Sequence, residues 1–126
     1  MTRTRPGLLR TRSRDPRKKL AAQLDALWSH LVKHRSGNKC QRCLSIVAVQ
    51  AHHIIERRYT ATRWDLRNGI ALCLNCHSRV HAKVVQIVPP HDLLMQALPI
   101  TPRTMDFMEQ AWVGLQLHAK AMGAKR

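Results

Sequence analysis

The sequence predicts a small α+β fold in which two strands and a helix are flanked by an N-terminal and a C-terminal helix. Two observations predict the flanking helices, since apolar residues recur at steps of three and four along residues 16–34 and 101–122. A third concerns the middle of the chain, where all four cysteines and four of the eight histidines lie within residues 40–81. Aromatic residues make up only 4% of the 126 residues, so the core must be small. Small cores are commonly stabilised further by a metal ion or by disulfides.

The charge of the chain favours nucleic acid as its partner. Lys and Arg number 22 against 7 for Asp and Glu, which gives a formal net charge of +15 and a pI near 11.3. Membrane binding would need a helix with a continuous apolar face and a basic opposite face, and neither long helix is basic enough. No run of about 18 apolar residues predicts a membrane span, and the N-terminus lacks the apolar stretch of a secretory signal. We therefore expect no membrane association, and a cytoplasmic protein whose paired cysteines bind metal.

Residues 1–19 are predicted to form a flexible basic arm, and residues 20–126 a single domain. The arm holds eight basic residues and one acid, so it has little to bury. We expect it to lie along nucleic-acid phosphates, although a solubilising tail is the alternative. After it, Asp15-Pro16 predicts the cap and first residue of a helix over 16–34.

The centre of the chain is predicted to alternate strands and helices. Residues 45–55 are rich in Ile and Val and predict a strand, and a short second strand covers 69–72. The connection between them, residues 56–67, is polar and rich in arginine. A helix begins near Leu74, and a short helix is expected over 91–98.

Thr101-Pro102 predicts the start of the C-terminal helix over 101–122. Its apolar stripe is expected to pack on the core, with a dimer seam as the alternative. Whether the chain is a monomer or a homodimer is therefore left open.

Two Cys-x-x-Cys pairs, Cys40 with Cys43 and Cys73 with Cys76, predict a zinc site. Each pair comes from one turn, and four thiolates can close a tetrahedron around one Zn²⁺. Four sulfurs leave no coordination position free, so this ion is expected to be structural. Free or disulfide-bonded cysteines are the alternative.

The histidines predict a second site of a different kind. His77 and His81 are four residues apart and share one face of the predicted helix. His52 and His53 are adjacent near a strand end, where successive side chains point in opposite directions. One of them can bind a metal with His77 and His81 while the other, kept neutral, deprotonates a water molecule beside a metal-bound phosphate. Alternatively, these histidines only extend the zinc site.

The arrangement of His52-His53, Asn68, Cys76-His77 and His81, framed by the cysteine pairs, resembles the HNH endonucleases and their ββα-metal fold. The resemblance covers about residues 40–83. It rests on the spacing, which is 15 residues from His53 to Asn68, 9 from there to His77 and 4 from His77 to His81. It implies that residues 20–126 form a single HNH nuclease domain.

The resemblance also implies a role for each residue. His53 would be the general base that activates water, and His52 and His77 would bind the catalytic divalent cation with His81 as a third ligand. Asn68 would hold the loop that bears His53 or, as in some members, approach the metal. The four cysteines would bind the structural zinc found in many members. The implied reaction is hydrolysis of a DNA phosphodiester with Mg²⁺, Mn²⁺, Ni²⁺ or Zn²⁺, leaving a 5′-phosphate and a 3′-hydroxyl.

Arginines around the motif are expected as a group to contact DNA phosphates. They are Arg57, Arg58, Arg63, Arg67 and Arg79. Trp64 is expected to be either a wedge in a DNA groove or a lid over the zinc site. Many family members have a proline and glycines after the His-His pair, where this chain has Ile54-Ile55-Glu56-Arg57-Arg58, so the shape of this loop is open.

The sequence thus favours a metal-dependent endonuclease that nicks or cuts double-stranded DNA. The first alternative is a non-catalytic zinc-ribbon DNA-binding protein, which needs four metal ligands and leaves the histidines and Asn68 without a function. The second is a structure-specific nuclease for branched or recombination DNA. Compact, basic members of the family are often encoded by phages or mobile elements, which implies the host cytoplasm for a phage-encoded protein.

Overall fold

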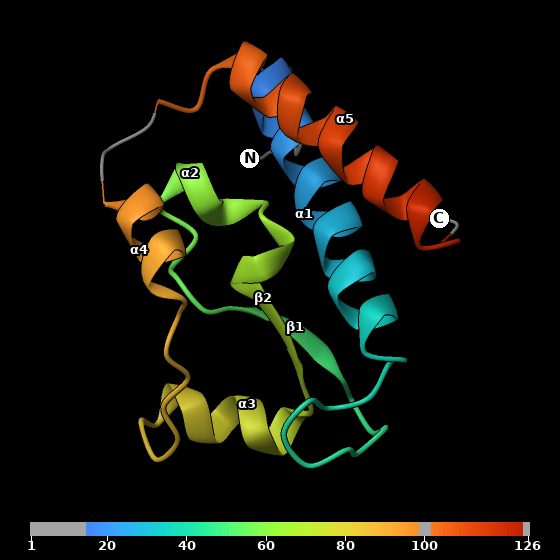
Figure 1. Cartoon of the computed structure of the whole chain (residues 1–126), viewed down its shortest axis with the longest axis vertical. Coiled ribbons are helices and arrows are strands. Elements are labelled where there is room, and N and C mark those ends of the chain that lie inside the picture. The colour runs from blue at the N-terminus through green and yellow to red at the C-terminus, as the bar shows by residue number, and fades with distance from the viewer. Residues whose placement is uncertain (1–14, 99–101, 125–126) are drawn as a thin grey trace, which may run out of the picture.

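The computed structural model describes residues 15–98 and 102–124, in which five helices, a 3-10 turn and a two-stranded sheet follow one another (Figure 1). The order is α1 (Pro16–Arg35), β1 (Gln50–His53), α2 (Thr60–Arg63), η1 (Leu66–Asn68), β2 (Gly69–Leu72), α3 (Leu74–His81), α4 (His91–Ala97) and α5 (Met105–Ala121). The predicted α+β fold, with its ββα core and flanking helices, is confirmed. Most of the predicted basic arm lies outside the described residues.

The sheet is an antiparallel hairpin of β1 and β2, in which Gln50 lies opposite Leu72 and His53 opposite Gly69. The second strand is confirmed at its predicted residues, but the prediction that the first begins at residue 45 is wrong. Leu44 and Ala48 have φ angles of 67° and 51°, outside the range of any strand. The chain therefore turns twice before β1 begins.

Helix α1 begins as predicted, because the Asp15 carboxylate accepts a hydrogen bond from the N–H of Arg17 and Pro16 occupies the first turn. It ends after Arg35, where Gly37 adopts a φ of 70°. Its buried face lies on the hairpin. Close approach is possible because β2 begins with a glycine, and a Cβ added at Gly69 would lie 2.9 Å from the Trp28 ring.

Helix α5 lies beside α1 and runs in the same direction (Figure 1). His34 near the end of α1 lies 3.4 Å from the carbonyl oxygen of Met122, which follows α5. The cap of α5 is Thr104, whose side chain accepts from the N–H of Phe107, and Pro102 precedes the helix, so the predicted start was too early. The stripe packs on α1 through Met108, Leu115 and Trp112, as expected for core packing.

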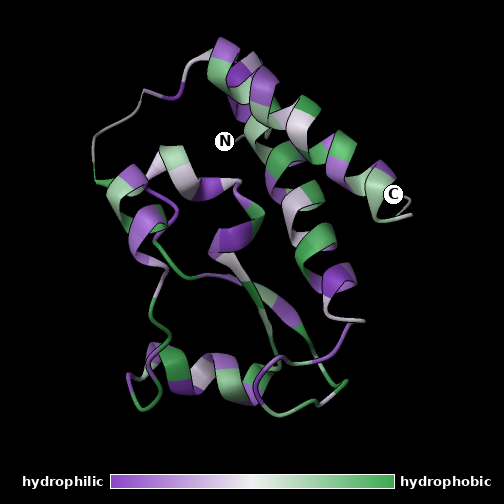
Figure 2. Ribbon diagram, in the orientation of Figure 1, coloured by the Kyte–Doolittle hydropathy of each residue, from purple (hydrophilic) through white to green (hydrophobic). Residues whose placement is uncertain are grey.

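The remaining elements enclose two smaller apolar clusters. One surrounds the cysteines and includes Leu72 with Ile70, Val80 and Ile87, and the other joins Ile55 and Tyr59 to α4. Hydrophobic and hydrophilic residues alternate along α1 and α5, as expected of helices buried on one face (Figure 2). In the part of the chain that the structure describes, no helix is both long enough and apolar enough to cross a membrane.

Candidate active site and metal centres

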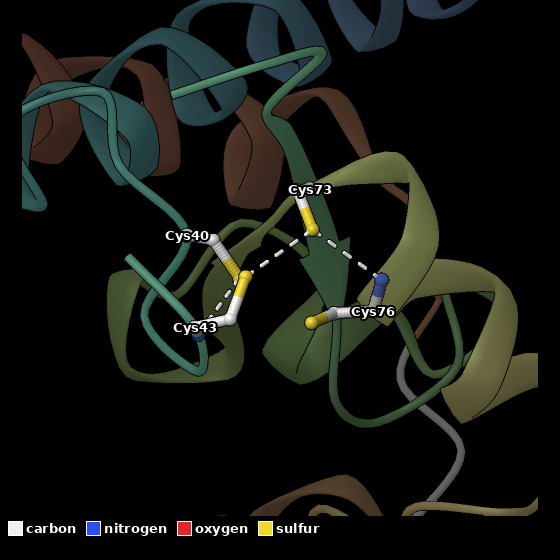
Figure 3. Close-up of side chains that lie close together, drawn as sticks. All are labelled: Cys40, Cys43, Cys73 and Cys76. Carbon is white, nitrogen blue, oxygen red and sulfur yellow. Dashed lines mark hydrogen bonds between the residues drawn. The ribbon is translucent and has the colours of Figure 1, made fainter. Parts of the chain in front are cut away.

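The four cysteines lie close together where the turn after α1 meets the beginning of α3 (Figure 3). Their sulfur atoms all lie within 4.8 Å of one another, and those of Cys43 and Cys73 are 3.6 Å apart. A Zn–S bond of about 2.3 Å places neighbouring sulfurs of a tetrahedral site roughly 3.8 Å apart. A disulfide would need about 2.05 Å. The cluster therefore fits a four-sulfur metal site and not a pair of disulfides.

Backbone N–H groups stabilise the thiolate form of two of these cysteines. The sulfur of Cys40 accepts from the N–H groups of Arg42 and Cys43, each at 3.4 Å, and that of Cys73 accepts from the N–H of Cys76 at the same distance. Burial raises the pKa of Cys40, but the N–H donors around it outweigh burial and lower the pKa to about 6. The Arg42 guanidinium, 3.6 Å from the sulfur of Cys76, offsets part of the negative charge.

Three histidines form a second cluster between β1 and α3. The Nε2 of His77 lies 3.1 Å from the Nδ1 of His52 and 2.9 Å from the Nε2 of His81. Metal–nitrogen bonds of about 2.1 Å place adjacent ligand nitrogens roughly 3 Å apart. The structure thus brings together the three expected ligands at the spacing that one cation requires.

Gln50 sets the orientation of His77. The Gln50 Oε1 lies 2.7 Å from the Nδ1 of His77, and because an amide oxygen only accepts, Nδ1 carries the proton. The Nε2 of His77 therefore presents its lone pair to His52 and His81. One lone pair does not accept two strong hydrogen bonds, so a cation between the three rings accounts better for the arrangement. Sequence analysis missed Gln50, although strand alternation places residues 50 and 52 on one face.

His53 lines the same cleft as the three-histidine cluster but has different neighbours. Its Nε2 donates a hydrogen bond of 2.9 Å to the carbonyl oxygen of Arg63, so in the neutral ring the lone pair belongs to Nδ1. Burial lowers the pKa of His53 to about 4, against the opposing effect of the Arg63 carbonyl. The ring is therefore neutral near pH 7 and able to accept a proton.

Asn68 is fully buried and holds the loop that follows His53. Its Oδ1 accepts from the N–H of Ile55 at 2.7 Å, and its Nδ2 donates to the carbonyl oxygens of Ile55 and Thr62 at 3.1 Å each. All three bonds join η1 to the loop and to α2. Of the two roles expected for Asn68, this geometry supports the one that positions the loop.

Four of the five arginines expected to contact DNA are exposed. Arg57 lines the cleft together with the histidines, and Arg79 lies on α3. Arg58 forms an ion pair of 3.0 Å with Glu56. Arg67 is shared between two carboxylates, those of Asp65 at 2.8 Å and of Asp92 at 3.0 Å.

Arg63, in contrast, is buried and turned away from solvent. Its guanidinium donates to both carboxylate oxygens of Asp25, at 3.1 and 2.7 Å, and the indole N–H of Trp64 donates to the same carboxylate at 2.8 Å. We therefore leave Arg63 out of the DNA contacts. Trp64 is buried and tilted against Phe107 in the core between α1 and α5, so neither a DNA wedge nor a zinc lid describes it.

The hairpin and α3 form a ββα module that carries a four-cysteine cluster and a three-histidine cluster, each of which could hold a metal ion. Residues 40–83 match the family model described as HNH endonuclease, which confirms the resemblance predicted from the sequence. No curated protein and no solved structure matches the chain.

Proposed function

We propose that the protein is a metal-dependent endonuclease that hydrolyses phosphodiester bonds of double-stranded DNA. One observation carries the proposal. The cleft that contains three converging histidine nitrogens also contains His53, a neutral imidazole whose Nδ1 has the lone pair. A cation site with open positions beside a general base is the arrangement that phosphodiester hydrolysis requires.

His53 is the general base in this proposal. Its Nδ1 takes a proton from the attacking water, while Nε2–H remains bonded to the carbonyl oxygen of Arg63. The same carbonyl stabilises the imidazolium once the proton has moved. Asn68 keeps the loop between His53 and α2 in one conformation, so the base is oriented before the substrate binds.

His52, His77 and His81 would hold the catalytic divalent cation. A bound cation supplies electrostatic stabilisation of the charge that develops on the phosphate and on the departing 3′-oxygen. Three nitrogen ligands leave coordination positions for substrate, whereas the four sulfurs of the other cluster leave none. We therefore assign the cysteine cluster to a structural Zn²⁺ and the histidine cluster to Mg²⁺, Mn²⁺, Ni²⁺ or Zn²⁺.

The exposed arginines would contact phosphates of the DNA backbone near the cleft. Arg57 lines the cleft and would contact the phosphate nearest the base, and the exposed Arg58, Arg67 and Arg79 would contact other phosphates. These contacts carry no sequence information. Binding is therefore expected to be tight at low salt, weak at high salt and tolerant of sequence.

The test is cleavage of supercoiled plasmid by the zinc-loaded protein with each of the four cations. We expect nicked and linear products, and a loss of about 10²–10⁴-fold in rate for His53→Ala. His91→Ala, which removes an exposed histidine at the start of α4, is the matched control and should cleave normally. Unchanged cleavage by His53→Ala would refute the assignment of the base.

The same assay separates the alternatives. A protein that binds DNA but cleaves it with none of the cations would be a non-catalytic zinc-ribbon protein. Much faster cleavage of a four-way junction than of linear duplex would identify a structure-specific nuclease.

A further inference from the structure

The base of the proposed reaction is covered by a side chain from outside the HNH segment. Trp28 belongs to α1, and its indole lies face to face with the His53 imidazole, with ring centroids 3.8 Å apart and an angle of 9° between the planes. Trp28 is buried, and its N–H donates a hydrogen bond of 2.9 Å to the carbonyl oxygen of Asp65. The indole is therefore itself fixed in position.

The geometry leaves His53 few other orientations. The Nε2–H bond to Arg63 fixes one edge of the imidazole, but a single hydrogen bond still allows the ring to swing about it. The parallel indole blocks one face and restricts that swing. Because β2 begins with Gly69, directly under the Trp28 ring, the hairpin can lie close enough to α1 for the two rings to touch.

We propose that Trp28 is a positioning residue for His53, so that α1, which lies outside residues 40–83, completes the catalytic site. The inference rests on the proposed function of His53 as the base. Trp28 touches neither substrate nor metal, and it acts by holding the plane in which Nδ1 meets the attacking water. Misplacement of a catalytic group by about 1 Å costs on the order of 10²-fold in rate.

The chain offers a control for the loss of an indole from the core. Trp112 of α5 is partly buried and packs against the same core, but its ring does not stack on His53. Trp28→Leu and Trp112→Leu remove the same atoms from one core. Trp28→Phe keeps a smaller aromatic face for the stack and loses the N–H bond to Asp65.

Three measurements are compared for the zinc-loaded proteins: kcat and KM for plasmid cleavage, metal binding by the histidine cluster, and the proton shifts of the His53 ring. We expect Trp28→Leu to lower kcat about 10²-fold with KM and metal binding unchanged, and Trp28→Phe to recover at least about tenfold of the loss. Trp112→Leu should leave the kcat of the folded protein unchanged. In the wild type the His53 ring protons should be shifted upfield by the indole, and Trp28→Leu should abolish this shift.

The outcomes separate the two proposals. If His53→Ala is inactive while folded Trp28→Leu keeps full kcat, the positioning role is wrong and the base stands. If His53→Ala is fully active, both the assignment of His53 as the base and the positioning role of Trp28 are wrong. If Trp28→Leu does not fold, the proposal is tested by the His53 proton shifts of the wild type and by the kcat of Trp28→Phe. His53 ring protons without an upfield shift would refute the stacking of the two rings.

Discussion

His52 and His53 are neighbours in sequence with different chemical surroundings. His52 faces the imidazoles of α3, so its Nδ1 points toward their ring nitrogens, whereas His53 faces an indole and a backbone carbonyl. Burial lowers the pKa of both rings to about 4, which keeps them neutral near pH 7. The different roles proposed for the two residues, metal ligand and general base, therefore rest on the direction and the neighbours of each ring.

At the residue scale, Asp25 should make the stability of the fold depend on pH. Burial raises the pKa of its carboxyl, but hydrogen bonds from Arg63 and Trp64 and the charges of Arg63 and Arg57 hold it below the usual 3.8. A group whose pKa is lowered on folding contributes stability above its unfolded pKa and loses it as the pH falls through the folded one. Asp25→Asn should thus cost roughly 1–3 kcal/mol near pH 7.

The measurement is urea unfolding of zinc-loaded wild type and Asp25→Asn at several pH values. The difference between their free energies of unfolding should be full at pH 6–7 and should shrink as the pH falls below about 4 and through the lowered pKa of folded Asp25. Asp92→Asn is the control, because it removes an exposed partner of Arg67 and should cost less than about 0.5 kcal/mol. A gap of constant size across this range would contradict the assigned role of the Asp25 carboxylate.

At the element scale, local patterns predicted α1, β2 and α3 because each has its own signal in the sequence. Asp15-Pro16 fixes the start of α1, and the spacing of His77 and His81 is helical. The first strand was predicted too long because Ile46 and Val47 have high strand propensity. These side chains are exposed, and they lie between Leu44 and Ala48, whose positive φ angles turn the chain.

Contacts between elements that are distant in the sequence have no local sequence pattern that predicts them. The ion pair of Asp25 with Arg63 joins α1 to the end of α2, and Trp28 reaches His53 only because Gly69 lets the hairpin approach. In the sequence, Arg63 is one of several arginines in a polar stretch and gives no sign of being buried. The grouping of the four cysteines and of the three histidines could thus be predicted, whereas the packing around His53 could not.

Two glycines of the fold should respond in opposite ways to alanine. At Gly69 an added Cβ would collide with Val32 and lie 2.9 Å from Trp28, so Gly69→Ala should destabilise the protein by about 1–3 kcal/mol. At Gly114, within α5, an added Cβ would meet nothing within 4 Å, so Gly114→Ala should stabilise it by about 0.5–1 kcal/mol. Urea unfolding midpoints at saturating zinc give both values, and a stabilising Gly69→Ala would refute the close packing of α1 on β2.

At the scale of the whole molecule, the two sides of the hairpin are stabilised in different ways. On one side lie α1 and α5, with a core of ordinary apolar side chains. On the other lies the cysteine cluster, whose small apolar surroundings bury little surface without a cation. The cleft that contains the histidines draws residues from both sides, since His77 and His81 belong to α3 and His53 packs against Trp28 of α1.

Loss of the structural zinc should therefore abolish the second metal site as well, whereas loss of the second site should leave the zinc in place. Cys73 caps α3 and contributes one of the four sulfurs, so Cys73→Ser should release zinc, unfold α3 and separate His77 and His81 from His52. His77→Ala should bind one metal ion fewer and keep its fold. Native mass spectrometry should count two ions in the wild type, one in His77→Ala and none in Cys73→Ser, with circular dichroism showing lost helicity only in the last. A stable, zinc-free Cys73→Ser with native helicity would show that α1 and α5 alone suffice to hold the hairpin and α3 together.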